Sequence, residues 1–259
     1  MRIFSVLSRI PYPLTDGGAI VSYNTIKYLN RAGHEIAAAA LNPKKHREAP
    51  ERLATVCSRV RALDIDTDIT ARGALSALAR KESYIASRFV SAEFLQILAE
   101  EIRSFAPDIV HLDHTLVGWC AGALRRAVPP AELPPIILRA HNVEYIIQRR
   151  LAEGERSALR RRYRALESER LRETERQYFR ECDSVAAITP EDAAEIRRMG
   201  FAGEIACVPA GVDVEEFAPA SESASILPNT ACYIGGMDWE PNIEAMRWFV
   251  DEILPKARR

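Results

Sequence analysis

The sequence predicts an α/β fold built on a doubly wound parallel sheet. Short apolar runs alternate with segments of helical periodicity from Arg2 to Val208, and Gly and Pro residues separate them. The chain opens with a complete βαβ unit, in which an apolar run at 2–7 is followed by a helix at 19–32 and a second apolar run at 35–41. Runs that are apolar throughout are typical of strands buried on both faces, as in a parallel sheet covered by helices.

The remaining elements follow the same alternation. Gly33 stops the first helix, and the long helix at 143–182 is expected to break at Gly154. The last helix is expected to have Thr189 as its cap and Pro190 at its first position. Together the elements complete one Rossmann-like domain, predicted to span residues 1–217. Strands are expected at 60–63, 109–112, 136–140, 184–188 and 205–208, and helices at 92–105, 116–127, 143–182 and 190–199.

The C-terminal residues are predicted to form only the first part of a second domain. Residues 218–229 lack periodic hydrophobicity and are rich in Ala, Ser, Pro and Glu, which indicates a linker. The pattern then restarts with an apolar run at 231–234 and a helix at 243–253. One βα unit cannot bury its own apolar face, so Trp248 and Phe249 are expected to lack partners. Residues 230–259 are therefore expected to be the incomplete start of a domain, left by truncation or proteolysis.

Composition excludes several classes of protein. Thirty-five basic residues nearly balance thirty-six acidic ones, so the net charge of −1 favours neither nucleic acid nor an acidic partner. The five cysteines are scattered without zinc or disulfide spacing, which fits a reducing cytoplasm. No apolar stretch has the length of a membrane span or a signal peptide.

The segment between Arg149 and Arg180 is dense in Arg and Glu, with Arg160, Arg161 and Arg162 in succession. Its basic excess is compatible with peripheral contact at the inner face of a membrane, or with a charged acceptor. A solvated helix face with i,i+4 ion pairs explains the same pattern.

Glycines follow the first predicted strand. Gly17 and Gly18 precede the helix at 19–32, and a helix N-terminus offers free amides and a positive dipole to phosphate oxygens. A tight turn is the alternative explanation. The segment is neither the G-x-G-x-x-G fingerprint nor a Walker loop, which disfavours a dinucleotide enzyme or a P-loop NTPase.

Polar residues follow the strand at 136–140. His141 comes directly after it, so its side chain is expected at the carboxyl edge of the sheet, where ligands of open α/β sheets bind. Asn142 as a helix cap and Glu144 as a charge at the helix start are the simpler explanation for those two residues. No helix start requires an imidazole at His141.

A metal site at the end of the strand at 109–112 is considered and not predicted. His111, Asp113 and His114 cluster there, but strand alternation directs only the first two to one face. No Ser-His-Asp order, Cys-His pair or acidic dyad is evident either.

Six segments, in order, resemble the family-4 retaining glycosyltransferases of the GT-B fold. "RAHNVEY" is similar to the variant found in enzymes that act on bacterial cell-surface polysaccharides. The resemblance covers nearly the whole chain and implies two Rossmann domains around a cleft. The other segments are "SRIPYPLTDGGAIVSYNTIKYLNRAGHEI", "PDIVHLDH", "SVAAITPEDAAEIRRMG", "VPAGVDVEEFAP" and "YIGGMDWEPNIEAMRWFVDEILP".

The resemblance implies metal-independent transfer, with retention, from a nucleotide-diphosphate sugar to a glycan or lipid-linked acceptor in cell-envelope polysaccharide synthesis. The nucleotide sugar is a substrate, and no cofactor is implied. His141 would be catalytic, beside the donor sugar, and Gly17 and Gly18 would approach the donor diphosphate. Ala210 departs from the Asn usual in the family. The cleft and the interdomain hinge would be marked by Asn142, Glu144, Thr189, Gly211, Val212 and Asp213.

Most donor contacts in this family come from the second domain, beyond its first βα unit. The resemblance therefore implies that this chain alone turns over negligibly. Two other functions stay open: a GT-B nucleotide-sugar epimerase, and a non-catalytic module that docks on a membrane or partner through its Arg-rich helix. The sequence determines neither donor, acceptor nor oligomeric state.

Overall fold

The computed structural model describes residues 1–217, 228–237 and 240–257. The first of its two compact units comprises residues 1–14 and 18–211 and contains a seven-stranded parallel sheet in the order β3-β2-β1-β4-β5-β6-β7. The predicted doubly wound parallel sheet is confirmed. Its strands are β1 (Arg2–Leu7), β2 (Glu35–Pro43), β3 (Arg59–Ile65), β4 (Ile109–Asp113), β5 (Ile136–Ala140), β6 (Ser184–Ala187) and β7 (Glu204–Cys207).

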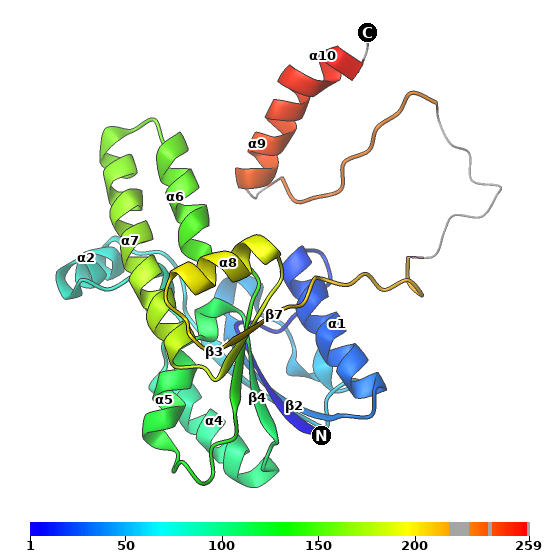
Figure 1. Cartoon of the computed structure of the whole chain (residues 1–259), viewed down its shortest axis with the longest axis vertical. Coiled ribbons are helices and arrows are strands. Elements are labelled where there is room, and N and C mark those ends of the chain that lie inside the picture. Colours follow the sequence, from blue (N-terminus) through cyan, green and yellow to red (C-terminus); the bar gives the residue numbers. More distant parts are fainter. Residues whose placement is uncertain (218–227, 238–239, 258–259) are drawn as a thin grey trace. The chain divides into compact units, whose positions relative to one another are not determined.

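Helices pack on both faces of this sheet (Figure 1). The strand order changes direction at β1, because β2 and β3 follow on one side of it and β4 to β7 on the other. The helices of the first unit are α1 (Gly17–Arg31), α2 (Ala71–Arg80), α3 (Tyr84–Ser87), α4 (Ala92–Phe105), α5 (Trp119–Ala127), α6 (Glu144–Gly154), α7 (Ala158–Arg180) and α8 (Pro190–Arg198).

The core has one cluster of buried side chains on each face of the sheet. Phe4 and Val6 of β1 belong to the larger cluster, with apolar residues of α4 and α5. Ile3 and Leu7 belong to the smaller cluster, with residues of α1. Alternate residues of one strand thus enter different clusters, which explains why the buried strands read as uninterrupted apolar runs.

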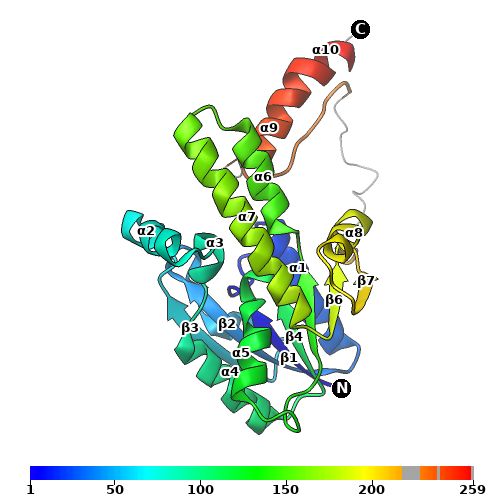
Figure 2. The same cartoon turned by 60° about the vertical axis from the view of Figure 1, so that its left-hand side comes forward.

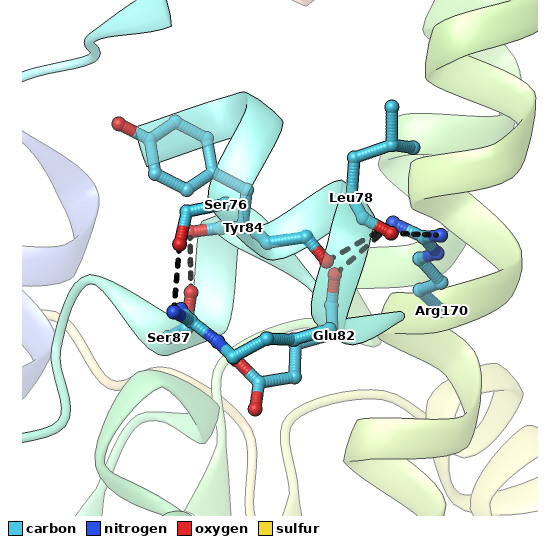
Figure 3. Close-up of polar contacts among 8 residues, drawn as sticks. Ser76, Leu78, Glu82, Tyr84, Ser87 and Arg170 are labelled. Atoms are coloured by element: carbon cyan, nitrogen blue, oxygen red, sulfur yellow. Dashed lines mark hydrogen bonds and ion pairs between the residues drawn. The ribbon is translucent and has the colours of Figure 1, made fainter. Parts of the chain in front are cut away.

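The predicted break in the long helix is confirmed. α6 ends at Gly154 and α7 starts at Ala158, and the two helices form a hairpin above the carboxyl edge of the sheet (Figure 2). The helices α2 and α3 were not predicted. Thr70 caps α2 by accepting a hydrogen bond from the Gly73 amide at 3.0 Å, and Arg170 of α7 donates to the carbonyl oxygen of Leu78 at 3.2 Å (Figure 3).

The second unit comprises residues 15–17 and 212–259. Its described helices are α9 (Glu240–Trp248), a π-helical turn (Phe249–Ile253) and α10 (Leu254–Ala257). The apolar run at 231–234, expected to supply the strand of a βα unit, forms no strand, because these residues have no regular structure. A lone extended segment has no neighbouring strand to satisfy its amides and carbonyls. Most of the expected linker, 218–227, lies outside the described residues.

Candidate functional site

The candidate site lies at the carboxyl ends of the central strands. β1 separates the two directions of strand order, and ligands of open α/β sheets bind at such a switch point. The register places Leu7, at the end of β1, opposite Asp113, at the end of β4. Asp113 in turn lies opposite Arg139 of β5, two residues before His141. Sheet register therefore brings residues that are distant in sequence to one edge.

Asp113 and His141 form a buried dyad. The His141 Nε2 atom lies 2.8 Å from Asp113 Oδ1, and the side chains are only 7% and 1% exposed. Burial alone would raise the pKa of the Asp113 carboxyl, but hydrogen bonds from His141 and Ser22 hold that pKa below its usual range. The ionised carboxylate can only accept, so Nε2 carries the proton and Nδ1 of a neutral His141 keeps a lone pair for a ligand.

Arg139 lies buried beside this dyad. One of its amino groups donates to the Thr25 hydroxyl of α1, and its Nε has no hydrogen-bond partner among the described residues. Burial lowers the pKa of the guanidinium, and the negative charge of Asp113 opposes that shift. The charges of Arg139 and Asp113 therefore offset each other in the interior.

His114 occupies a strained backbone conformation. Its φ of 104° and ψ of 142° lie in a region that residues with a side chain rarely adopt. Its Nδ1 accepts a hydrogen bond from the Leu116 amide at 3.1 Å, which leaves the proton of the neutral ring on Nε2, 3.6 Å from Glu144 Oε1. Burial lowers the pKa of His114 to about 3, so the ring is neutral at pH 7. Its ring centroid lies 5.2 Å from that of His141.

Glu175 of α7 caps the helix that follows His141. Its two carboxyl oxygens accept hydrogen bonds from the amides of Glu144 at 2.8 Å and Tyr145 at 3.0 Å. The expectation that Asn142 caps this helix is wrong, because Val143 occupies the N-cap position and Asn142 donates to the side chain of Glu144, at 3.4 Å, instead of accepting from a backbone amide. Burial raises the pKa of Glu175 to about 8. This cap fixes the path of the chain between β5 and α6.

The other predicted site residues lie at ends of elements. Gly17 begins α1, and a Cβ built on it would meet no atom within 4 Å. Gly18 follows it in the first turn. Thr189 caps α8, where its Oγ1 accepts from the Asp192 amide at 3.1 Å. Neither local packing nor a positive φ requires a glycine at position 17.

The predicted hinge residues lie where one compact unit gives way to the other. Gly211 is the last residue of the first unit and Val212 begins the second stretch of the other. The Asp213 side chain is buried and accepts from the Glu215 amide at 3.1 Å. No structural observation assigns these residues a role in motion.

Within the described residues, no group of three or more His, Cys, Asp or Glu side chains is placed to hold a metal ion. His111 forms no hydrogen bond with either dyad residue in the described part of the chain; its Nδ1 lies 3.5 Å from the Ser5 hydroxyl of β1, and a charge on its ring acts on Asp113 through space. Sequence reasoning missed Glu175 and the pairing of Asp113 with His141. The positions of Asp113 and His141 at the ends of neighbouring strands were the available signal for the second.

This arrangement defines an open α/β domain of the Rossmann type with a polar site at its switch point. The chain belongs to glycosyltransferase family 4, whose model matches residues 15–216. No protein of curated function matches the sequence significantly.

Solved structures similar to the chain include several transferases. Sucrose-phosphate synthase from Thermosynechococcus elongatus has a TM-score of 0.44 and 14% identity over 84% of this chain and 93% of that one. The lipopolysaccharide outer core galactosyltransferase WaaB, in its apo form, has a TM-score of 0.45 and 13% identity over 83% and 47%. Arabidopsis thaliana UGT89C1 complexed with UDP has a TM-score of 0.44 and 10% identity over 86% and 52%. The chain thus spans about half the length of the last two.

Proposed function

We propose that the chain is the acceptor-side domain of a retaining glycosyltransferase. The enzyme transfers a sugar from a nucleotide-diphosphate donor to a glycan or lipid-linked acceptor of the cell envelope, on the cytoplasmic side. Membership of family 4 supports sugar transfer. Transfer breaks the bond between the anomeric carbon and the diphosphate oxygen and the O–H bond of an acceptor hydroxyl. It forms a glycosidic bond between that carbon and the acceptor oxygen and releases the nucleoside diphosphate and the hydroxyl proton.

The Asp113–His141 dyad is the observation that carries this proposal. The 2.8 Å bond to Asp113 fixes the His141 ring, so Nδ1 is available to accept a hydrogen bond from a hydroxyl of the donor sugar. His141 would thereby position the donor sugar at the carboxyl edge of the sheet. The α1 N-terminus at Gly17 would offer backbone amides to the diphosphate.

Calorimetric titration of UDP-glucose and GDP-mannose tests the proposal. The titrations use the chain itself and the chain joined to a complete second Rossmann domain. We expect tight binding and sugar transfer only with both domains, and a loss of transfer of 10-fold or more in His141→Ala. Equal binding by the chain alone would contradict the division of labour between the domains. Release of an epimerised nucleotide sugar without acceptor would identify an epimerase instead.

Peripheral membrane contact is a second candidate, favoured by one surface. Leu159, Tyr163 and Leu166 occupy successive turns of α7 and are 80%, 39% and 42% exposed, next to the arginines at 160–162. Exposed apolar side chains flanked by arginines are typical of helices that lie on anionic membranes. The described helices include none long and apolar enough to cross a bilayer.

Sedimentation with vesicles of neutral or anionic lipid tests this contact. Salt-sensitive binding to anionic vesicles, lost when all three arginines at 160–162 become Ala, is the expected result. Failure to sediment with anionic vesicles at low salt would exclude membrane contact and leave the transferase proposal standing.

A further inference from the structure

A groove between α6, α7 and α8 opens at the same edge of the sheet as His141. Its volume is about 780 Å³, within the range of pockets that hold small molecules. Asn142 and Thr189, which follow β5 and β6, line its inner end. Asn142 is the direct neighbour of His141 in the chain, so this end of the groove adjoins the loop that carries the dyad histidine.

One wall of the groove is basic. Arg149, Arg150 and Arg172 line it from α6 and α7. The guanidinium carbons of Arg149 and Arg172 lie 5.8 and 5.7 Å from the centroid of the Tyr145 ring, which holds both groups by cation–π contact. Arg150 and Arg172 form no ion pair with any carboxylate of the described residues. Unpaired guanidinium groups on one wall are suited to bind phosphate or carboxylate oxygens.

The facing wall, formed by α8, is acidic. Glu191 and Asp192 line it, and no cation pairs with either one in the described part of the chain. Glu195 is already neutralised, because Arg198 lies 2.7 Å from it and Tyr145 donates to it. Carboxylates accept hydrogen bonds, and sugar hydroxyls are donors that match them.

The basic wall and the acidic wall together favour a ligand that carries both an oxyanion and hydrogen-bond donors. Four arginines and four carboxylates line the groove, so their charges balance. The net charge of the groove therefore does little to attract a simple anion. A molecule with an oxyanion at one end and hydroxyls at the other satisfies both walls. The volume accommodates a sugar with such a substituent.

We propose that this groove binds the sugar acceptor and that the acceptor is an anionic saccharide, with a phosphate or carboxylate held by Arg150 and Arg172. The inference rests on the proposed transferase function, because it assigns the acceptor of that reaction. Glu191 and Asp192 would accept hydrogen bonds from the saccharide hydroxyls.

Calorimetric titration of the chain with four probes tests the inference. The probes are glucose 1-phosphate, glucuronic acid, glucose and inorganic phosphate. We expect at least one anionic sugar to bind 10-fold or more tightly than both glucose and phosphate. Arg150→Ala and Arg172→Ala should each weaken it by about 10-fold or more, because a hydrogen bond to a charged group contributes about 1.5–3 kcal/mol. Arg72→Ala removes an exposed arginine outside the groove and should leave binding unchanged.

Three results would overturn the inference. They are glucose binding as tight as that of the anionic sugars, inorganic phosphate binding as tight as that of the anionic sugars, and equal losses in Arg72→Ala and Arg172→Ala. Nucleotide-sugar binding by the two-domain protein separates this inference from the proposed function. If the two-domain protein binds the anionic sugar but no nucleotide sugar, the proposed donor chemistry is refuted and the acceptor site stands. If it binds the nucleotide sugar but no anionic sugar, the acceptor site is refuted and the proposed function stands.

Discussion

The Asp113–His141 dyad predicts a strong energetic coupling between two residues that are 28 positions apart. Both side chains are almost fully buried, so neither Asp113→Ala nor His141→Ala leaves a partner that water can reach. Each single change should cost about 2–4 kcal/mol of unfolding free energy, since a buried polar group or charge loses its partner. The double variant should cost less than the sum, with a coupling energy of about 2 kcal/mol.

Urea unfolding followed by circular dichroism measures the four proteins of this cycle. The pair of Lys44 and Asp68 provides a matched control, because these side chains lie 3.3 Å apart but are 62% and 51% exposed. Coupling in the control should stay below about 1 kcal/mol. Additive costs at the dyad, or a coupling no larger than in the control, would show that the buried hydrogen bond does not hold His141.

Three further predictions concern stability. The folded pKa of His114, about 3, lies below its unfolded value of about 6.5, so the contribution of His114 to unfolding free energy should fall by about 2 kcal/mol between pH 7 and pH 5. The raised pKa of Glu175, about 8, acts in the opposite direction over this range, so the His114 contribution is measured as the difference between the wild type and His114→Gly in urea titrations at both pH values. That difference should change by about 2 kcal/mol, and His114→Gly should be more stable than His114→Ala by about 1–2 kcal/mol because it relieves the backbone strain. A difference that does not change with pH, or equal stability of the two variants, would contradict this. Glu175→Ala should lower unfolding free energy by about 2 kcal/mol and accelerate hydrogen exchange in the first turn of α6, where unchanged exchange would argue against the cap. Gly118→Ala should lower the unfolding free energy, measured by thermal unfolding, by about 1–3 kcal/mol, because the new Cβ would lie 2.7 Å from the Tyr178 ring. The control Gly17→Ala, where a Cβ meets no atom within 4 Å, should change it by no more than about 0.5 kcal/mol. Equal losses in the two variants would refute the packing argument.

Sequence periodicity was sufficient for the sheet. The run at 109–112 predicted β4, which the structure extends only to Asp113, because a strand buried on both faces must be apolar along its length. The helix α2 was missed because it buries only Ala77 and leaves Leu75 exposed, so its apolar positions do not mark a core face. The strand at 231–234 was predicted from local hydrophobicity, which carries no information on whether a neighbouring strand is available.

The site was predictable to the extent that it depends on strand ends. His141 follows β5 directly, so its place at the carboxyl edge could be read from the chain. Its partner could not, because Asp113 reaches it through the register between β4 and β5, which is a property of the whole sheet. The Glu175 cap is 31 residues from the amide of Glu144 and depends on how the α6–α7 hairpin closes. Local sequence contains neither relationship.

The central place of β1 has a consequence for synthesis on the ribosome. One neighbour of β1, β2, follows it closely, but the other neighbour is β4, and the contact between Ser5 and His111 joins residues 106 positions apart. At about 5–20 residues per second, the nascent chain needs roughly 5–20 s to supply β4 after β1 has been made. During that interval one edge of β1 has unpaired backbone amides and carbonyls, and an exposed strand edge of this kind is prone to the aggregation that chaperones prevent. The strand that organises the ligand site is thus the one whose pairing is completed late.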